Sequence, residues 1–170
     1  EIAGMMKHLL LPLLLLLALL GGCNSAIQVG DIYVEVLTYT PSPDSDNDAQ
    51  ITVRYSNHNV YPIAIKSSSF KLYLEGDYVG FARMHEPIGI PQVSTGTRTV
   101  KLHIEKPGVI AKILASPASL VKYRLESNLL AEVIDDKADI KTRKDGVLPI
   151  ESFKVAPAEK KTVQDAPTIK

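Results

Sequence analysis

Apolar and polar residues alternate along most of the chain between residues 31 and 150. In the stretch QITVRYSN, Ile51, Val53 and Tyr55 share one side and the residues between them are polar. The same two-residue period recurs over residues 32–36, 70–75, 100–105, 121–133 and 139–150. A period of two is typical of strands with one buried face, as in antiparallel sheets. The pattern therefore predicts an all-β domain of antiparallel strands.

Clusters of turn-forming residues separate the predicted strands. They are rich in Asp, Asn, Ser, Pro and Gly, and they lie at residues 41–48, 56–59, 75–77 and 144–146. Short strands with turns at this spacing are typical of a sandwich or a barrel. The pattern alone leaves both architectures open.

One segment departs from the two-residue period. Residues 107–115 begin with a proline, which suits the first turn of a helix because it needs no N–H there. The four apolar residues that follow at helical spacing are Val109, Ile110, Ile113 and Leu114. We expect one short helix that buries these four side chains and covers one end of the domain.

The start of the chain carries an apolar run, LLLPLLLLLALL, from Leu9 to Leu20. As a helix it would span about 18 Å, well short of the roughly 30 Å hydrocarbon layer of a membrane. A short basic start before such a run and small residues after it are typical of a secretory signal peptide. Residues 1–22 are therefore predicted to be a signal, with translation starting at Met5 or Met6.

The signal ends in Leu20-Gly21-Gly22-Cys23, which holds the only cysteine in the chain. One cysteine cannot form an internal disulfide, and an exposed free thiol would be a liability after secretion. The four residues resemble the bacterial lipobox, which signal peptidase II cuts before the cysteine, here between Gly22 and Cys23, after lipid has been attached to the sulfur. The resemblance predicts that acylated Cys23 joins the protein to membrane lipid through fatty-acid chains such as palmitate. The alternative is an ordinary signal peptide with a chance cysteine.

The residue after the cysteine indicates which of the two bacterial membranes holds the lipid anchor. In enterobacterial lipoproteins an aspartate at this position favours retention in the inner membrane, whereas this chain has Asn24. We therefore expect a protein of the bacterial cell envelope, anchored in the outer membrane, with its domain in the periplasm.

The length and the net charge of the chain limit its domain organisation and the classes of partner that it can bind. The 170 residues suffice for one domain with its own core. We expect a linker over residues 23–29, the β-domain over residues 30–151 and a disordered tail over residues 152–170, which lack an apolar period. Lys and Arg number 19, as do Asp and Glu. A neutral chain has no electrostatic footprint for nucleic acid, so we expect no nucleic-acid partner and a monomeric soluble domain.

The order of short motifs resembles a known family. Asn57 and Asn59 match the two asparagines of an Asn-Pro-Asn signature that follows the second strand, although His58 stands where the family has proline. Residues 61–63 match the apolar segment that comes next. The further matches are Gly76, Val79 and Gly80 in a hairpin, Ile90-Pro91, and two late strands at residues 121–125 and 146–150. In this order they resemble the water-stress-and-hypersensitive-response (WHy) domain of the late embryogenesis abundant (LEA) group two proteins.

The resemblance covers residues 30–150, nearly all of the predicted domain. It implies an antiparallel β-sandwich of the immunoglobulin or fibronectin-III type, without enzymatic activity or a cofactor. It also implies a role in protection against drying and other stress. The alternative function is a structural accessory lipoprotein that docks through a sheet edge onto a larger envelope complex.

Asparagines and aspartates supply the candidate binding residues. Asn57 and Asn59 can bind a ligand or cap a turn, and their place between two strands favours the turn. Asp44, Asp46 and Asp48 take the first odd positions of a calcium loop, but the glycine and the glutamate that such a loop needs are missing. We expect no metal site at these residues.

Catalytic patterns are also missing from the chain. His58, His85 and His103 lack the spacing of a zinc pair, and we expect His103 to be exposed on the polar face of its strand. The sequence holds no GxSxG, HExxH, P-loop or GxGxxG pattern. We therefore predict no catalytic, cofactor or metal residues, and a protein that is not an enzyme.

Overall fold

A computed structural model describes residues 31–134 and 136–154. The strands are β1 (Ile32–Ser42), β2 (Ser45–Asn57), β3 (Ile63–Leu74), β4 (Asp77–Met84), β5 (Ile88–Ile90), β6 (Ser94–Ile104), β7 (Leu120–Val133) and β8 (Asp136–Pro149). Helix α2 (Pro107–Leu114) lies between β6 and β7, and a 3-10 helix, η1 (Ile150–Phe153), follows β8. Within these residues, the prediction of an all-β fold with one short α-helix is confirmed, and η1 is an element that the sequence pattern did not predict.

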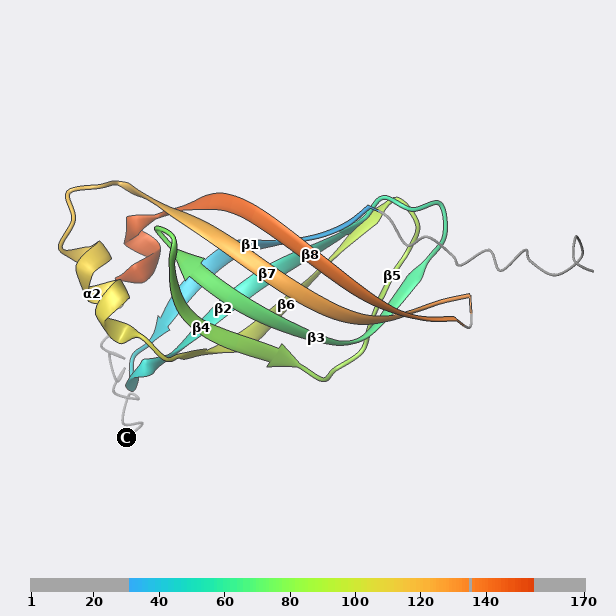
Figure 1. The fold of residues 1–170 in the computed structure, drawn as a ribbon, viewed down its shortest axis with the longest axis horizontal. Helices are drawn as coiled ribbons and strands as arrows, with labels where there is room; N and C mark the ends of the chain where they lie inside the picture. The colour runs from blue at the N-terminus through green and yellow to red at the C-terminus, as the bar shows by residue number, and fades with distance from the viewer. Residues whose placement is uncertain (1–30, 135, 155–170) are drawn as a thin grey trace, which may run out of the picture.

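All the strands belong to one antiparallel sheet. Their order is β1-β2-β6-β4-β3-β7-β8, with β5 paired to β3. The sheet folds over so that β1, β2 and β6 form one layer of the sandwich and β3, β7 and β8 form the other (Figure 1).

The sheet passes from one layer to the other where β4 pairs with β6. Only three residue pairs join these strands, and Gly80 lies opposite Ile104 in the first of them. A Cβ atom on Gly80 would collide with the backbone oxygen of His103. Glycine is therefore needed here, because the two backbones approach too closely for any side chain.

The buried faces of the strands form a single core. Ile51, Val53 and Tyr55 are fully buried, as the alternating pattern predicted, and they meet Phe70 and Leu72 from β3 in the same cluster. Burying each large apolar side chain contributes about 1.5–3 kcal/mol. This core holds the two layers of the sandwich together and positions the loops at both of its ends.

A tyrosine joins the two layers near the outer strands of the sheet. The hydroxyl of Tyr123 on β7 accepts a hydrogen bond from the Val36 N–H at 3.2 Å and donates one to the Val36 oxygen at 3.3 Å. Val36 lies on β1, the last strand on its side of the sheet, so these backbone groups lack a second strand there. A Cβ atom on Gly146 would lie 2.6 Å from the Tyr123 side chain. Glycine at this position therefore leaves the space that the tyrosine occupies.

Helix α2 covers one end of the sandwich together with η1 (Figure 1). Ile113 is buried, and Val109 and Ile110 are half-buried against the core. The expectation that Leu114 is buried was wrong, because this side chain is 40% exposed. The helix ends at Leu114, so no further turn covers this side chain.

The domain extends further than the predicted boundary at residue 151. Phe153, which the sequence pattern placed in the tail, is buried and stacks on Tyr39 with a centroid distance of 4.5 Å. Ile150 is buried as well, since residues three apart share one face of a 3-10 helix. Residues 155–170 of the predicted tail lie outside the described residues.

Candidate functional site

The turn that follows β2 is held by one buried side chain. The amide nitrogen of Asn57 points to the backbone oxygens of Tyr61 at 2.9 Å, Ile90 at 3.3 Å and Pro91 at 3.0 Å. Its side-chain oxygen accepts hydrogen bonds from the backbone N–H of Asn59 at 3.0 Å and from the Asn59 amide at 2.9 Å. These contacts use the hydrogen-bonding groups of the carboxamide. Asn57 therefore clamps the β2–β3 turn to the end of β5, and Asn59 supports it.

An aspartate near the start of β2 engages the neighbouring strand β6. Asp48 lies 3.1 Å from the Lys101 ammonium and 3.6 Å from His103 Nδ1. The hydrogen bond from Lys101 holds the pKa of Asp48 below its usual value. His103 is exposed, as its place on the polar face predicted. Within residues 31–134 and 136–154, no three His, Cys, Asp or Glu side chains are grouped to hold a metal ion.

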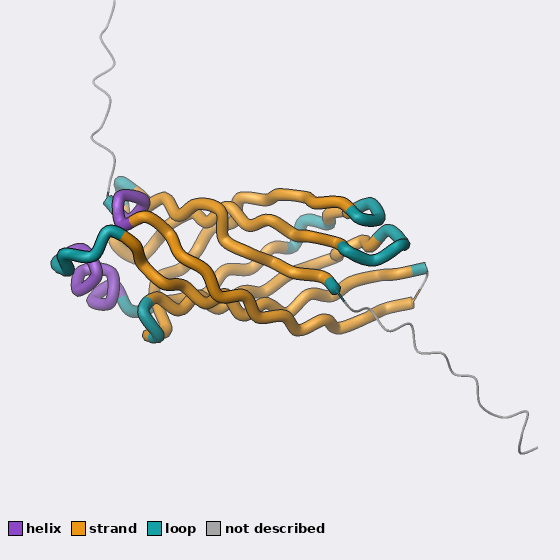
Figure 2. Tube along the Cα trace, turned by 90° about the horizontal axis from the view of Figure 1, so that it is seen from above, coloured by secondary structure: helices purple, strands orange, loops and turns teal. Residues whose placement is uncertain are grey.

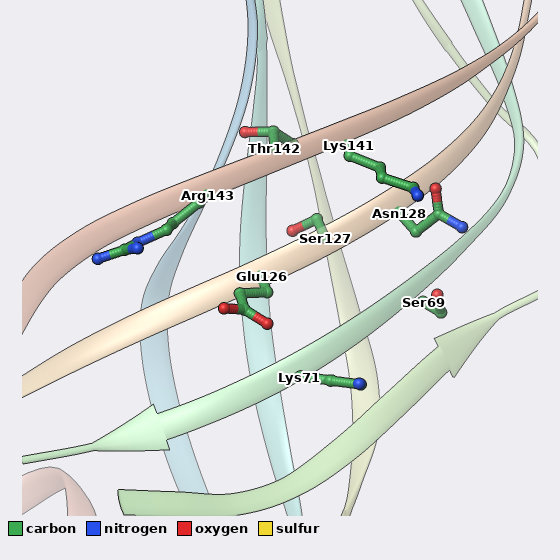
Figure 3. A pocket seen from close by; sticks show the side chains of 8 residues that line it. All are labelled: Ser69, Lys71, Glu126, Ser127, Asn128, Lys141, Thr142 and Arg143. Carbon is green, nitrogen blue, oxygen red and sulfur yellow. The ribbon is translucent and has the colours of Figure 1, made fainter. Parts of the chain in front are cut away.

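A polar depression of about 500 Å³ lies over β3, β7 and β8 (Figure 3). Two rows of outward-facing residues cross these strands in register. One row is Ser69, Asn128 and Lys141, and the other is Lys71, Glu126 and Arg143. The alternating pattern predicts that each of these side chains faces outward. It cannot predict the register that places them side by side, so the depression was not predicted.

The depression is basic. Lys71, Lys141 and Arg143 face one carboxylate, Glu126, which leaves a surplus of two positive charges. Glu126 accepts a hydrogen bond from the Tyr73 hydroxyl at 3.2 Å. The surface can therefore hold an acidic group by charge and hydrogen bonding.

Ser127 is also among the residues that line the depression, but it is buried, whereas its neighbours on β7 face outward. It is buried opposite Phe70, and its Oγ makes no hydrogen bond within the described part of the chain. This serine is therefore not placed as a nucleophile next to a base.

The predicted lipid-attachment residue Cys23, with the cleavage site between Gly22 and Cys23, lies outside the described residues. Within residues 31–134 and 136–154, no helix has the length and apolar character needed to cross a membrane.

Solved structures resemble the chain at a distance. A protein from Archaeoglobus fulgidus matches with a TM-score of 0.43 and 14% identity, over 71% of this chain and 95% of that one. AT1g01470 from Arabidopsis thaliana matches with a TM-score of 0.43 and 14% identity, over 71% of this chain and 78% of that one. A candidate LEA protein, At2g46140.1, matches with a TM-score of 0.39 and 14% identity, over 74% of this chain and 75% of that one. Such distant likenesses carry no functional assignment.

No protein-family model matches the chain, and no curated protein sequence matches it significantly. Membership of the LEA group two family therefore stays a prediction.

Proposed function

We propose that the chain is a lipid-anchored, non-enzymatic protein of the bacterial cell envelope whose β-sandwich acts as a protective or binding module. The observation that carries the proposal is Leu20-Gly21-Gly22-Cys23, which directly follows an apolar run too short to span a membrane. Only eight residues lie between Cys23 and Ile32, where the first strand begins. Two or three acyl chains on the cysteine would give a durable attachment, whereas one would bind only marginally.

Fatty-acid labelling in bacterial cells tests the anchor. The wild-type chain should take up a clickable fatty acid, and Cys23→Ser should stay unlabelled and accumulate as uncleaved precursor. Asn24→Asp is the matched control: it should still be labelled but should shift from the outer-membrane fraction to the inner-membrane fraction. An unlabelled wild-type chain would overturn the proposal.

The protective role is of the LEA group two type, and the order of motifs around Asn57, Asn59 and Gly80 supports it. In this role the basic depression over β3, β7 and β8 is the binding surface, and its surplus positive charge favours acidic ligands. Survival after drying tests the role. Host cells that lack the protein should survive drying less well than cells that carry it, and Lys71→Glu with Arg143→Glu should reduce the protection without releasing the anchor. Equal survival with and without the protein would contradict it.

One observation favours the alternative of an accessory lipoprotein. Strand β8 is a long end strand of the sheet: β7 pairs with it on one side, and on its other side it lies near β1 without a paired strand, which leaves hydrogen-bonding groups for strand addition. Its exposed Lys137, Asp139 and Lys141 are the kind of charged residues that limit unspecific edge pairing. Cross-linking in intact membranes separates the two functions, because a single stoichiometric partner bound along β8 would favour the accessory role.

A further inference from the structure

Loops gather at the end of the sandwich away from α2 (Figure 2). Three turns at this end each carry one exposed apolar side chain. Val60, between β2 and β3, is 81% exposed. Val93, between β5 and β6, is 73% exposed, and Ile134, after β7, is 68% exposed. Among the large apolar side chains of the described residues, these three are the most exposed. We call them the apolar tips.

Hydrogen bonds and strand register place the three turns at the same end. The N–H of Val93 donates to the Asn59 oxygen at 3.2 Å, which joins the first two turns. The start of β3 pairs with the end of β7 through Ala64 and Glu132, so the turn after β7 lies beside the turn before β3. Figure 1 shows these turns together, at the opposite end from α2.

Two of the tips have an unusual backbone. Val93 and Ile134 both have φ of 48°. This left-handed region suits glycine and asparagine, and a β-branched residue there is a rare outlier. Folding and solubility would both favour glycine or asparagine at such exposed positions. A strained, exposed apolar residue therefore indicates a function for the side chain itself.

The chain enters the domain at this same end. The oxygen of Asp31 accepts a hydrogen bond from the His58 N–H at 3.0 Å, so the start of β1 lies next to the turn of Val60. The eight steps from Cys23 to Asp31 reach at most about 29 Å when extended and average roughly 16 Å as a flexible coil. Strand β7 has 14 residues and is about 45 Å long. An anchor at Cys23 therefore holds the apolar tips much nearer to the membrane than α2.

We propose that Val60, Val93 and Ile134 insert into the interfacial region of the membrane that holds Cys23, so that the sandwich stands on the bilayer with α2 pointing away. This inference rests on the lipid anchor proposed above. Near the tips, Lys66 is paired with Glu132 at 2.9 Å. The exposed Asp136 and Lys137 that follow Ile134 also carry opposite charges. The contact rests on the three apolar side chains, so it should persist at high salt, which screens exposed charges.

The chain contains no tryptophan, so a single introduced tryptophan reports on its own surroundings. The full lipidated protein would be placed in phosphatidylethanolamine–phosphatidylglycerol vesicles whose acyl chains carry bromine, a short-range quencher. Val60→Trp and Ile134→Trp should lose at least half of their fluorescence and shift to shorter wavelength. Leu120→Trp, an exposed position at the start of β7 near α2, is the matched control and should be unaffected.

A second variant tests whether the tips act together. In a Val93→Trp background, changing Val60 and Ile134 to Asp should abolish the quenching while the protein still sediments with the vesicles. Sedimentation with the vesicles without quenching at Val60→Trp, or equal quenching at Leu120→Trp, would contradict the membrane contact of the apolar tips. Neither result would contradict the lipid anchor at Cys23. A wild-type chain that does not sediment with vesicles would overturn the anchor and the contact together. Protection of Val60→Trp from iodide without quenching by bromine would identify a protein partner instead, and it would also overturn the contact.

Discussion

Removing the side chain of Asn57 should strongly destabilise the domain. In Asn57→Ala, the oxygens of Tyr61, Ile90 and Pro91 and the N–H of Asn59 each lose their hydrogen bond with the Asn57 side chain. Each lost hydrogen bond costs about 1 kcal/mol, and more where water cannot replace it. Asn57 is fully buried, so we expect a loss of about 3–5 kcal/mol. Such a loss is a large share of the roughly 5–15 kcal/mol that stabilises a domain.

Asn59→Ala is the matched control for this change. The side chain of Asn59 is half-buried and donates to the oxygen of Asn57. Its removal should cost only about 0.5–1.5 kcal/mol. Urea unfolding of a secreted version without the anchor, residues 24–170, would measure both values. If Asn57→Ala unfolds within about 1 kcal/mol of the wild type, or no earlier than Asn59→Ala, the buried amide is not the clamp that holds this end of the sandwich.

Three further predictions follow from the core and the surface charges. Tyr123→Phe should lower the free energy of unfolding by about 1–2 kcal/mol in the same urea assay, because the backbone N–H and oxygen of Val36 lose their hydrogen bonds to the hydroxyl. An unchanged urea midpoint would contradict this role. Ile113→Ala should lower the free energy of unfolding by about 2–5 kcal/mol, whereas exposed Lys112→Ala should change it by under about 0.5 kcal/mol. Equal urea midpoints for the two variants would show that α2 does not seal the core. Hydrogen bonds from lysine or arginine partners hold the pKa values of three carboxyls, two half-buried and one exposed, below their ordinary values. Their contribution to stability is therefore present above about pH 4 and is lost as the pH falls through the lower folded-state values. Urea midpoints measured between pH 6 and pH 2 should therefore fall, and the fall should shrink when these residues are changed to their amides: Asp48, Glu132 and Asp145.

The parts of the fold that depend on local alternation could be predicted from the sequence. Ile51, Val53 and Tyr55 lie on the buried face because a strand places every second side chain on one side. The contact between Tyr123 and Val36 joins residues 87 positions apart, and nothing in the local pattern of either strand indicates it. Phe153 was placed in the tail for the same reason, since its partners in the core, such as Tyr39 on β1, are distant in the sequence.

The surface features were predicted less completely. Asn57 stood out because asparagine between two strands is typical of turns, but the oxygens of Ile90 and Pro91 that it binds are supplied by a later strand. Val93 and Ile134 gave no turn signal at all, because β-branched residues favour strands and avoid positive φ.

The lipid anchor on Cys23 can be measured by intact-mass spectrometry of the mature protein extracted from membranes. We expect a chain that begins at Cys23 and carries the added mass of a diacylglycerol on its sulfur, with further mass if the new amino group is acylated as well. Fragmentation should place all of this mass on Cys23 and leave Asn24 unmodified. A mature chain that begins at another residue, or that begins at Cys23 with a free thiol, would contradict the anchor and with it the placement of the domain at the membrane.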